Sequence, residues 1–391
     1  MLTSLRGSVI GLCFALSTAV GCFAEQPTPP SWVSNGAFLI TVLTNGIPAH
    51  LLIDTGAGQS FLDEELVNRL GLTRTGAITI ERLYSVERAE IVQLSNLAIG
   101  PLHLGPLDMM TSDLRPASSA LGTHIDGILG TNLLCKFAIF LDYSSGTARL
   151  ATGTELPSAG TPVKLTRRNE YYFVPVLLQD KEMNLLLDTG SNSSSLSWSA
   201  WLSLTPTWRP KSFIQGVASS GGSSGAAIVC LPRVAIGNER VRNLPIRLQP
   251  PTQTGLFADR RFDGLLGGDV LRQFIVTLDL ANQRIYLKKD PRYKRDRYQF
   301  STIGIQFLKD PLGSFTVVAV WVGSPADKAG IRIGDRILSV NEIPTKQMDL
   351  AFFSGQIHGA AGTIVRLTID SNGQESAVPI EIRDLLCKPN G

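Results

Sequence analysis

Cysteine and histidine are sparse in this sequence of 391 residues. Five cysteines are present, and two of them lie within the first 22 residues. The remaining Cys135, Cys230 and Cys387 are widely spaced and odd in number, which predicts neither a disulfide framework nor a zinc site. We therefore interpret Cys135 and Cys230 as small buried apolar residues. The four histidines show no metal-ligand spacing, so no metal or other cofactor is expected.

Charge and aromatic residues are also scarce. Charged residues make up 18% of the chain and aromatic residues 7%, and the formal net charge of +3 is too small to indicate nucleic-acid binding. Apolar residues are plentiful at 43%, and there are 37 glycines. This combination favours turn-rich, strand-rich domains with packed cores over a disordered chain.

The first 24 residues have the pattern of an export signal. Arg6 precedes an apolar run from Val9 to Val20, and small residues follow around residue 24. The run is short for a membrane span, although a retained membrane anchor is an alternative. Ala19 to Cys22 also resembles the lipobox of bacterial lipoproteins, in which a lipid is attached to Cys22. We expect an exported protein of the periplasm or cell envelope, with or without this lipid anchor.

An internal repeat organises most of the remaining chain. Each copy has two predicted strands joined by a tight turn, at Asn45-Gly46 in the first copy and at residues 179–182 in the second. In both copies the second strand runs into Asp-Thr-Gly, at residues 54–56 and 188–190. The predicted strands are residues 38–43 and 49–53 in the first copy, and 171–178 and 183–187 in the second.

The similarity between the copies continues downstream. Residues 126–130, Asp-Gly-Ile-Leu-Gly, are matched by Asp-Gly-Leu-Leu-Gly at 263–267, an offset of 137 residues against 134 at the first motif. A nearly constant offset indicates a duplication. Short strands with glycine-marked turns predict an all-β class for this region. Short helices are expected at residues 64–70 and 268–274.

The composition changes after residue 287. Residues 288–297 form a polar, basic run, which we interpret as a solvated linker, with contact to anionic lipid as a second interpretation. A third folded unit begins near residue 301. The predicted units are a signal peptide at 1–24, two halves at 33–156 and 157–289, a linker at 290–300, and a C-terminal domain at 301–385.

The duplicated motif predicts a pair of carboxylates, Asp54 and Asp188. Like charges about 3 Å apart cannot both ionise cheaply, so such a pair shares one proton. The ionised member can then take a proton from water while the protonated member donates to a substrate carbonyl. The pair titrates as a unit, and its nucleophile is a water molecule.

The residues after each aspartate suit this chemistry. Gly56 and Gly190 permit a sharp turn that brings backbone close to a carboxylate. Thr55 and Thr189 offer hydroxyl groups that can lock one loop against the other. Apolar strands before each loop place it in a dry environment, which strengthens its electrostatic interactions.

The two loops differ at the residue that follows each glycine, Ala57 in the first and Ser191 in the second. Ser191 can donate a hydrogen bond to Asp188 and favour its ionised form, whereas Ala57 has no hydroxyl for Asp54. From this difference we predict that Asp54 is more often the protonated member of the pair.

These residues carry a family resemblance. Asp-Thr-Gly-Ala at 54–57 and Asp-Thr-Gly-Ser at 188–191 resemble the active-site loops of aspartic peptidases of the retropepsin and pepsin type. The Ile-Leu-Gly at 128–130 and Leu-Leu-Gly at 265–267 resemble the element that threads beside the catalytic loop in that family. The resemblance covers residues 35 to 290, and it implies two retropepsin-like β-barrel halves fused in one chain.

The resemblance implies an aspartic-type endopeptidase that hydrolyses proteins or peptides. Because both aspartates lie in one chain, activity should not require dimerisation. Two alternatives keep the fold without this activity. One is a duplicated β-domain in which the Asp-Thr-Gly loops are only turns, and the other is a non-catalytic envelope protein that binds peptides in the groove.

The family also implies flaps, hairpins that close over the substrate. In the second copy the candidate is the Gly- and Ser-rich stretch 216–225, which suits a mobile lid, although it could be only a surface loop. In the first copy the matching stretch 81–90 is charged and lacks glycine, with Tyr84 as a candidate flap aromatic. Residues 221–225 also fit the Gly-x-Ser-x-Gly motif of serine hydrolases, but that motif needs a following helix, and residues 226–231 are predicted to form a strand.

The third unit resembles a PDZ domain. Ser-Pro-Ala-Asp-Lys-Ala-Gly-Ile at 324–331 and Gly-Asp-Arg-Ile-Leu-Ser-Val-Asn at 334–341 resemble the core of such domains, especially those of bacterial envelope proteases. Ser324 is expected to cap a short helix that Gly330 ends, and residues 336–340 are predicted to form a strand.

This second resemblance implies peptide binding. PDZ domains add an extended peptide as a strand beside a helix and hold its carboxylate with backbone N–H groups. The matching loop is Ile303-Gly304-Ile305, which leads into Phe307, and residues 348–357 would line the other side of the groove. Gln306 stands where the family has a second glycine. The alternative is that the domain only packs against the peptidase.

Overall fold

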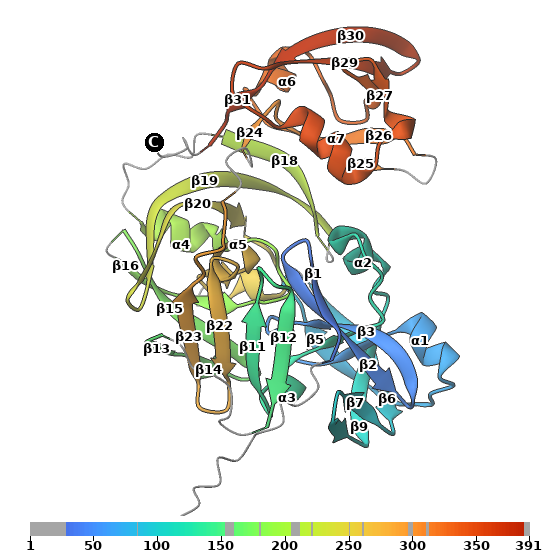
Figure 1. Cartoon of the computed structure of the whole chain (residues 1–391), viewed down its shortest axis with the longest axis vertical. Coiled ribbons are helices and arrows are strands. Elements are labelled where there is room, and N and C mark those ends of the chain that lie inside the picture. Colours follow the sequence, from blue (N-terminus) through green and yellow to red (C-terminus); the bar gives the residue numbers. More distant parts are fainter. Residues whose placement is uncertain are drawn as a thin grey trace, which may run out of the picture.

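The computed structural model has the expected β-rich architecture (Figure 1). The predicted signal peptide and Tyr84 lie outside the residues that it describes. Within the described residues, no helix combines the length and apolar character that crossing a membrane would require. The described residues are 29–83, 85–152, 160–179, 181–204, 212–219, 222–249, 251–259, 262–295, 300–309 and 313–386.

A ten-stranded sheet forms the first half, in the order β5-β6-β9-β4-β10-β3-β2-β7-β8, with β1 paired to β2. Its strands are β1 (Ser31–Ser34), β2 (Ala37–Thr44), β3 (Ile47–Ile53), β4 (Phe61–Asp63), β5 (Arg74–Glu81), β6 (Val86–Leu94), β7 (Leu97–Ile99), β8 (Leu102–Leu104), β9 (Leu107–Ser112) and β10 (Gly127–Leu129). Its helices are α1 (Glu64–Arg69), α2 (Arg115–Leu121) and α3 (Thr131–Leu134).

An eight-stranded sheet forms the second half, in the order β14-β15-β16-β21-β17-β20-β19-β18. Its strands are β14 (Thr166–Arg168), β15 (Tyr171–Leu178), β16 (Lys181–Leu187), β17 (Ser195–Ser197), β18 (Ser212–Ser219), β19 (Gly222–Ile236), β20 (Glu239–Gln249) and β21 (Gly264–Leu266). Its helices are α4 (Trp198–Ser203), the 3₁₀ helix η1 (Leu256–Ala258) and α5 (Gly268–Leu271).

A five-stranded sheet joins the two halves, in the order β12-β11-β22-β23-β13. It contains β11 (Ala138–Asp142), β12 (Thr147–Ala151), β13 (Pro162–Lys164), β22 (Phe274–Asp279) and β23 (Arg284–Lys289). In the antiparallel pair β11–β22, Phe140 lies opposite Thr277, its counterpart in the repeat. The repeat axis therefore passes between these two residues, and one continuous hydrophobic core runs through both halves.

Local structure agrees with most of the predicted turns and helices. Asn45 and Gly46 both have positive φ, 48° and 83°, as a two-residue hairpin turn requires. The predicted turn at 179–182 was too long, because strand β16 already begins at Lys181. The helix expected at 268–274 is only α5, because Phe274 starts strand β22 of the shared sheet.

The C-terminal domain has its own core, separate from that of the two halves. Ser324 accepts a hydrogen bond from the N–H of Asp327 and caps the short helix, and Gly330 follows that helix with φ of 86°. The elements are β24 (Ser301–Thr302), β25 (Ile305–Lys309), β26 (Phe315–Val320), α6 (Pro325–Lys328), β27 (Arg336–Val340), β28 (Ile343–Pro344), η2 (Thr345–Gln347), α7 (Leu350–Ile357), β29 (Ile364–Ser371), β30 (Gln374–Glu381) and β31 (Arg383–Asp384).

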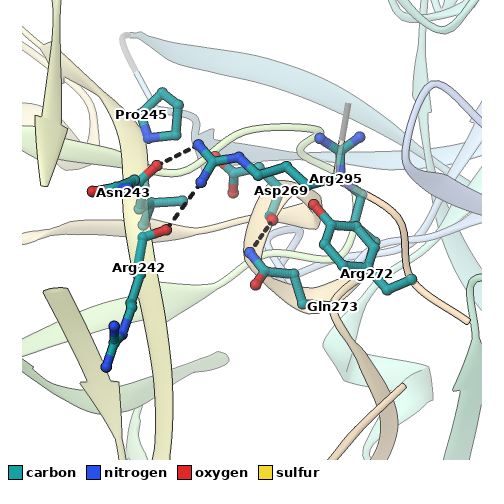
Figure 2. Close-up of a pocket in the computed structure, with 9 residues that line it drawn as sticks. Arg242, Asn243, Pro245, Asp269, Arg272, Gln273 and Arg295 are labelled. Atoms are coloured by element: carbon teal, nitrogen blue, oxygen red, sulfur yellow. Dashed lines mark hydrogen bonds between the residues drawn. The ribbon is translucent and has the colours of Figure 1, made fainter. Parts of the chain in front are cut away.

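Arginines of the predicted linker are bound to the protein itself. The guanidinium of Arg292 pairs with Asp142, at 2.7 Å, and with Asp290, at 2.9 Å. Arg295 donates to the backbone carbonyls of Arg242 and Asn243 (Figure 2). The run was expected to be a solvated linker, but its described part is held against the protein by these ion pairs and hydrogen bonds.

The interpretation of Cys230 as a simple buried residue was wrong. Cys230 is disulfide-bonded, and its partner lies outside the described residues. Cys135 is a free, half-buried cysteine packed against the main core, as expected. Spacing alone could not predict the bridge, because a disulfide depends on which strands fold together.

Candidate active site

The two Asp-Thr-Gly loops are built in the same way in each half. Strand β3 pairs in parallel with β10, and strand β16 pairs in parallel with β21. Where these strands end, the N–H of Asp54 donates to the carbonyl of Leu129 at 3.0 Å, and that of Asp188 to Leu266 at 3.1 Å. Each downstream Gly element therefore supports one aspartate loop from the side.

The glycine that ends each of these elements is required by close packing. A Cβ on Gly130 would lie 2.2 Å from the carbonyl oxygen of Gln59, and one on Gly267 would lie 2.6 Å from that of Ser193. Distances below 3.0 Å are not tolerated by real Cβ atoms without movement of the neighbour. The recurrence of glycine in both copies thus reflects contact with the backbone of the aspartate loop.

Reciprocal threonine hydrogen bonds lock the two loops together. The hydroxyl of Thr55 donates to the carbonyl of Leu187 and that of Thr189 donates to the carbonyl of Ile53, each at 2.7 Å. Each hydroxyl oxygen also accepts the N–H of the opposite threonine at 3.1 Å. Both side chains are fully buried, so the loops of the two halves form one rigid unit.

Replacing Thr189 by valine should destabilise the protein through this lock. The change keeps the side-chain shape but leaves the carbonyl of Ile53 and the N–H of Thr55 without a partner. Each buried orphan group costs about 1–3 kcal/mol. Urea unfolding should show this loss in Thr189→Val and almost none in the control Thr166→Val, which is exposed on β14. Equal stabilities would contradict the lock.

The lock brings the Asp54 and Asp188 side chains within hydrogen-bonding reach of each other. Asp54 accepts the N–H of Gly56 at 2.8 Å, and Asp188 accepts the N–H of Gly190 at 3.0 Å. Burial raises the pKa of both carboxyl groups. The pKa of Asp188 is raised further by the adjacent charge of Asp54, since two like charges at contact cannot both ionise cheaply.

The structure differs from the predicted asymmetry, in which the hydroxyl of Ser191 bonds Asp188 and Asp54 is more often protonated. The hydroxyl of Ser191 donates to the carbonyl of Ser193 at 2.9 Å, and only its N–H reaches Asp188, at 2.8 Å. Asp188 is also the more buried aspartate, with 6% of its surface exposed, whereas Asp54 is half-buried. The N–H of Ser191 favours the ionised form of Asp188, but deeper burial outweighs it and favours the shared proton on Asp188, the reverse of the sequence-based prediction.

A hairpin from the first half reaches across to the second. It consists of β5 and β6, and its turn contains Arg82 and Leu83. The carbonyls of Arg82 and Leu83 accept the N–H groups of Leu256 and Phe257, at 2.9 and 3.1 Å. Leu83 also packs into an apolar cluster of the second half that contains Phe257. The charged stretch 81–90 was expected to depart from the flap pattern. It belongs to this hairpin, which is held by contacts with the second half.

Tyr171 is a site residue that the sequence analysis missed. Its ring lies 3.4 Å from the Cβ position of Gly58, just beyond the first aspartate loop, and its hydroxyl donates to the carbonyl of Glu81 at 3.3 Å. Burial, with the charges of Glu81 and Asp54, raises its pKa to about 12. Comparison of the two copies could have drawn attention to this residue. Its match in the first copy is Ala37, so the aromatic side chain occurs in one half and not in the other.

Removing the Tyr171 hydroxyl should loosen the first hairpin. A single hydrogen bond contributes about 0.5–1.5 kcal/mol, so amide exchange around Glu81 should accelerate by about 2- to 13-fold in Tyr171→Phe. Hydrogen–deuterium exchange of the full chain measures this rate. Tyr286→Phe, in β23 of the shared sheet, is the matched control, and an equal effect in both variants would refute the role of this contact.

The second hairpin, β18–β19, contains the Gly- and Ser-rich stretch predicted as a lid. Its strands pair from Ser212 opposite Ile228 to Ser219 opposite Gly222, and β18 lies against helix α2 of the first half. Each half therefore extends a hairpin towards the other. Because residues 222–225 lie within β19, the Gly-x-Ser-x-Gly match has no strand–turn–helix context and is not a serine hydrolase elbow.

A buried carboxylate supports the second aspartate loop from behind. Asp269 accepts the N–H and the hydroxyl of Ser194, at 2.9 and 2.6 Å, and that hydroxyl accepts the N–H of Gly267 at 3.0 Å. In the first half, Ser60 donates to Asn132 in the same way at 2.7 Å. A small pocket adjoins Asp269 (Figure 2). It is lined by Arg242, Asn243, Leu244, Pro245, Asp269, Arg272, Gln273, Tyr293 and Arg295.

The predicted peptide-binding loop of the third domain lies at the edge of its sheet. β25 pairs only with β26 among the described strands, and Phe307 on β25 packs against Phe353 of α7 with ring centroids 4.5 Å apart. The N–H groups of Ile303 and Gly304 are already bound, by the carbonyl of Ile357 and by the hydroxyl of Thr302, each at 3.4 Å. In this conformation those two amides are not free to hold a carboxylate.

Comparison with known families agrees with this architecture. The family described as aspartyl protease matches residues 40–133 and 174–270, one segment in each half. The family described as PDZ domain matches residues 316–370. The chain therefore contains an aspartyl protease region in two segments, followed by a C-terminal PDZ domain, which confirms both resemblances. No curated protein matches the chain. Among the described residues, no group of His, Cys, Asp and Glu is arranged to hold a metal ion.

Proposed function

We propose that this protein is an exported aspartic endopeptidase, with Asp54 and Asp188 as its catalytic pair. The observation that carries the proposal is the placement of the two carboxylates. They face each other at the junction of the halves, each held by the N–H of its own Gly and both raised in pKa by burial. Such a pair retains one proton where an isolated carboxyl group would be fully ionised.

In the proposed reaction the carboxylate of Asp54 accepts a proton from a water molecule as that water attacks the peptide carbonyl. The protonated Asp188 donates to the carbonyl oxygen, so negative charge does not accumulate there. The tetrahedral intermediate then breaks its C–N bond: the leaving amine takes the proton from Asp54, and a hydroxyl of the intermediate returns a proton to Asp188, which restores the pair. The threonine lock keeps both carboxylates in this geometry through the cycle.

The raised pKa of Asp188 predicts the pH range of activity. Activity requires that one carboxyl group of the pair be protonated, so it is lost as pH rises through the higher of the two macroscopic pKa values. The alkaline limb of kcat should therefore lie well above the ordinary range of a carboxyl group, near 4. A pH–rate profile from pH 3 to 9 measures it, and a limb near pH 4 would contradict the assignment.

The deciding experiment treats the purified full chain with a mixed peptide library. Cleavage that Asp54→Asn and Asp188→Asn each abolish would support the peptidase. Binding without cleavage from pH 3 to 8 would instead identify a non-catalytic peptide-binding protein with the same fold. Export and attachment of a lipid to Cys22 remain proposals from the sequence, and mass spectrometry of the mature N-terminus tests both.

A further inference from the structure

The PDZ domain is packed onto the second hairpin through an apolar cluster. Ile228 of β19 is 5% exposed and packs with Ala319 at the end of β26 and with the adjacent Trp321, which is also 5% exposed. Phe300, Leu385 and Leu386 complete this cluster, which we call the docking cluster. Figure 1 shows β18 and β19 running beneath the PDZ domain, and β18 lies against β26.

The docking cluster is continuous with the predicted peptide-binding loop. The N–H of Trp321 donates to the carbonyl of Gly304 at 2.9 Å, and the hydroxyl of Ser324 reaches the same carbonyl at 3.4 Å. A Cβ on Gly304 would lie 3.1 Å from Leu385. The loop therefore cannot move without displacing residues that contact the hairpin.

The other end of the same hairpin reaches the first half. β18 lies against helix α2, and Leu121 at the end of α2 packs in a cluster that includes Ala57, three residues after Asp54. The hairpin thus contacts the PDZ domain near its base, at Ile228, and the first half towards its tip. A strand pair held at both ends in this way transmits a displacement at its base to the region beside the aspartate loops.

A disulfide bond also involves β19, close to Ile228 in the sequence. Cys230 lies two residues beyond Ile228 on β19, and side chains two apart point to the same face of a strand. It is disulfide-bonded, whereas Cys135 is free.

We propose that the PDZ domain acts as a clamp that holds the β18–β19 hairpin in position through the docking cluster. In this arrangement the PDZ domain fixes a hairpin that reaches the region beside the candidate active site. A ligand that displaces the loop at Gly304 also displaces this hairpin. The effect on catalysis rests on the proposed peptidase function. The coupling between the PDZ domain and the hairpin does not depend on that function.

Hydrogen–deuterium exchange of the full chain tests the clamp directly. Ile228→Ala truncates the docking cluster and should accelerate exchange of the β18 amides by about tenfold or more, since loss of a buried isoleucine removes substantial packing. Val229→Ala is the matched control, because its side chain lies in the main core instead of the docking cluster. Unchanged β18 exchange in Ile228→Ala, or equal acceleration in both variants, would overturn the clamp.

Activity measurements separate the clamp from the proposed peptidase function. If the wild-type chain cleaves peptides, Ile228→Ala should lower kcat/KM more than Val229→Ala does. If the wild-type chain cleaves nothing, the proposed peptidase function fails, while the exchange result still decides the clamp.

Discussion

Replacing Asp188 by asparagine is expected to lower kcat for peptide hydrolysis by about 10²–10⁴-fold or more, the contribution of a positioned acid or base. The amide keeps the shape of the carboxyl group but can neither lose nor gain the shared proton. Asp54→Asn should cause a loss of similar size, because the pair acts as one unit. Steady-state kinetics on one cleaved peptide measures both. Asp113→Asn, which alters a surface carboxylate paired with Arg115, should leave kcat unchanged.

The same Asp188→Asn variant should be more stable than the wild type at neutral pH. The folded-state pKa of Asp188 is raised, so this carboxyl group favours the folded state when protonated and loses that contribution as pH rises through its folded pKa. Asparagine removes the cost of burying the ionised form. Each kcal/mol relieved raises Tm by about 2–4 °C in a domain of this size.

The pH dependence of that gain is the decisive feature. Calorimetry should show a higher Tm for Asp188→Asn at pH 7 and little difference below pH 4, where Asp188 is protonated in both folded and unfolded chains. A gain that is independent of pH would mean that asparagine improves packing instead of relieving charge burial. A loss at pH 7 would contradict the raised pKa.

Replacing Gly190 by alanine should remove activity without changing either carboxylate. A Cβ at this position would lie 2.4 Å from Cγ of Asp54, so the carboxyl group of Asp54 must move. Its neighbours leave little room, because the N–H of Gly56 already holds it. Misplacing a catalytic group by about 1 Å costs about 10²-fold in rate, and we expect a loss in kcat of at least this size.

Gly76→Ala provides the matched control for this prediction. Gly76 lies in β5, and a Cβ there would meet only Ile91, at an ordinary contact distance of 3.8 Å. Steady-state kinetics at the pH optimum compares the two variants, and circular dichroism checks that both are folded. If folded Gly190→Ala retains the wild-type kcat, the aspartates do not form the reacting pair in this geometry.

The repeat made much of the fold predictable. Alternating and continuous apolar runs beside Gly and Asn turns located strands β2, β3, β15 and β16, because strand period and turn chemistry are local properties. The cap at Ser324 and the strand at 336–340 were predictable for the same reason. The helix expected at 268–274 was too long because pairing of Phe274 in the shared sheet outweighed its local preference.

The errors concern contacts between distant segments. Cys230 was expected to be unpaired, but it is disulfide-bonded. Ser191 was expected to bond Asp188 through its hydroxyl, which instead reaches Ser193. Tyr171 was missed because its difference from Ala37 in the other copy does not say what the side chain contacts, and the fold places it beside the first aspartate loop.

The sequence by itself determined that two equivalent aspartate loops exist and that a third domain follows them, since a duplication and its motifs are written along one chain. Only the tertiary structure decided how the loops meet, through the hydrogen bonds between Thr55 and Thr189, and which aspartate is more deeply buried. It also decided where the PDZ domain lies. These features depend on the free energy of packing between segments far apart in sequence, which local patterns do not encode.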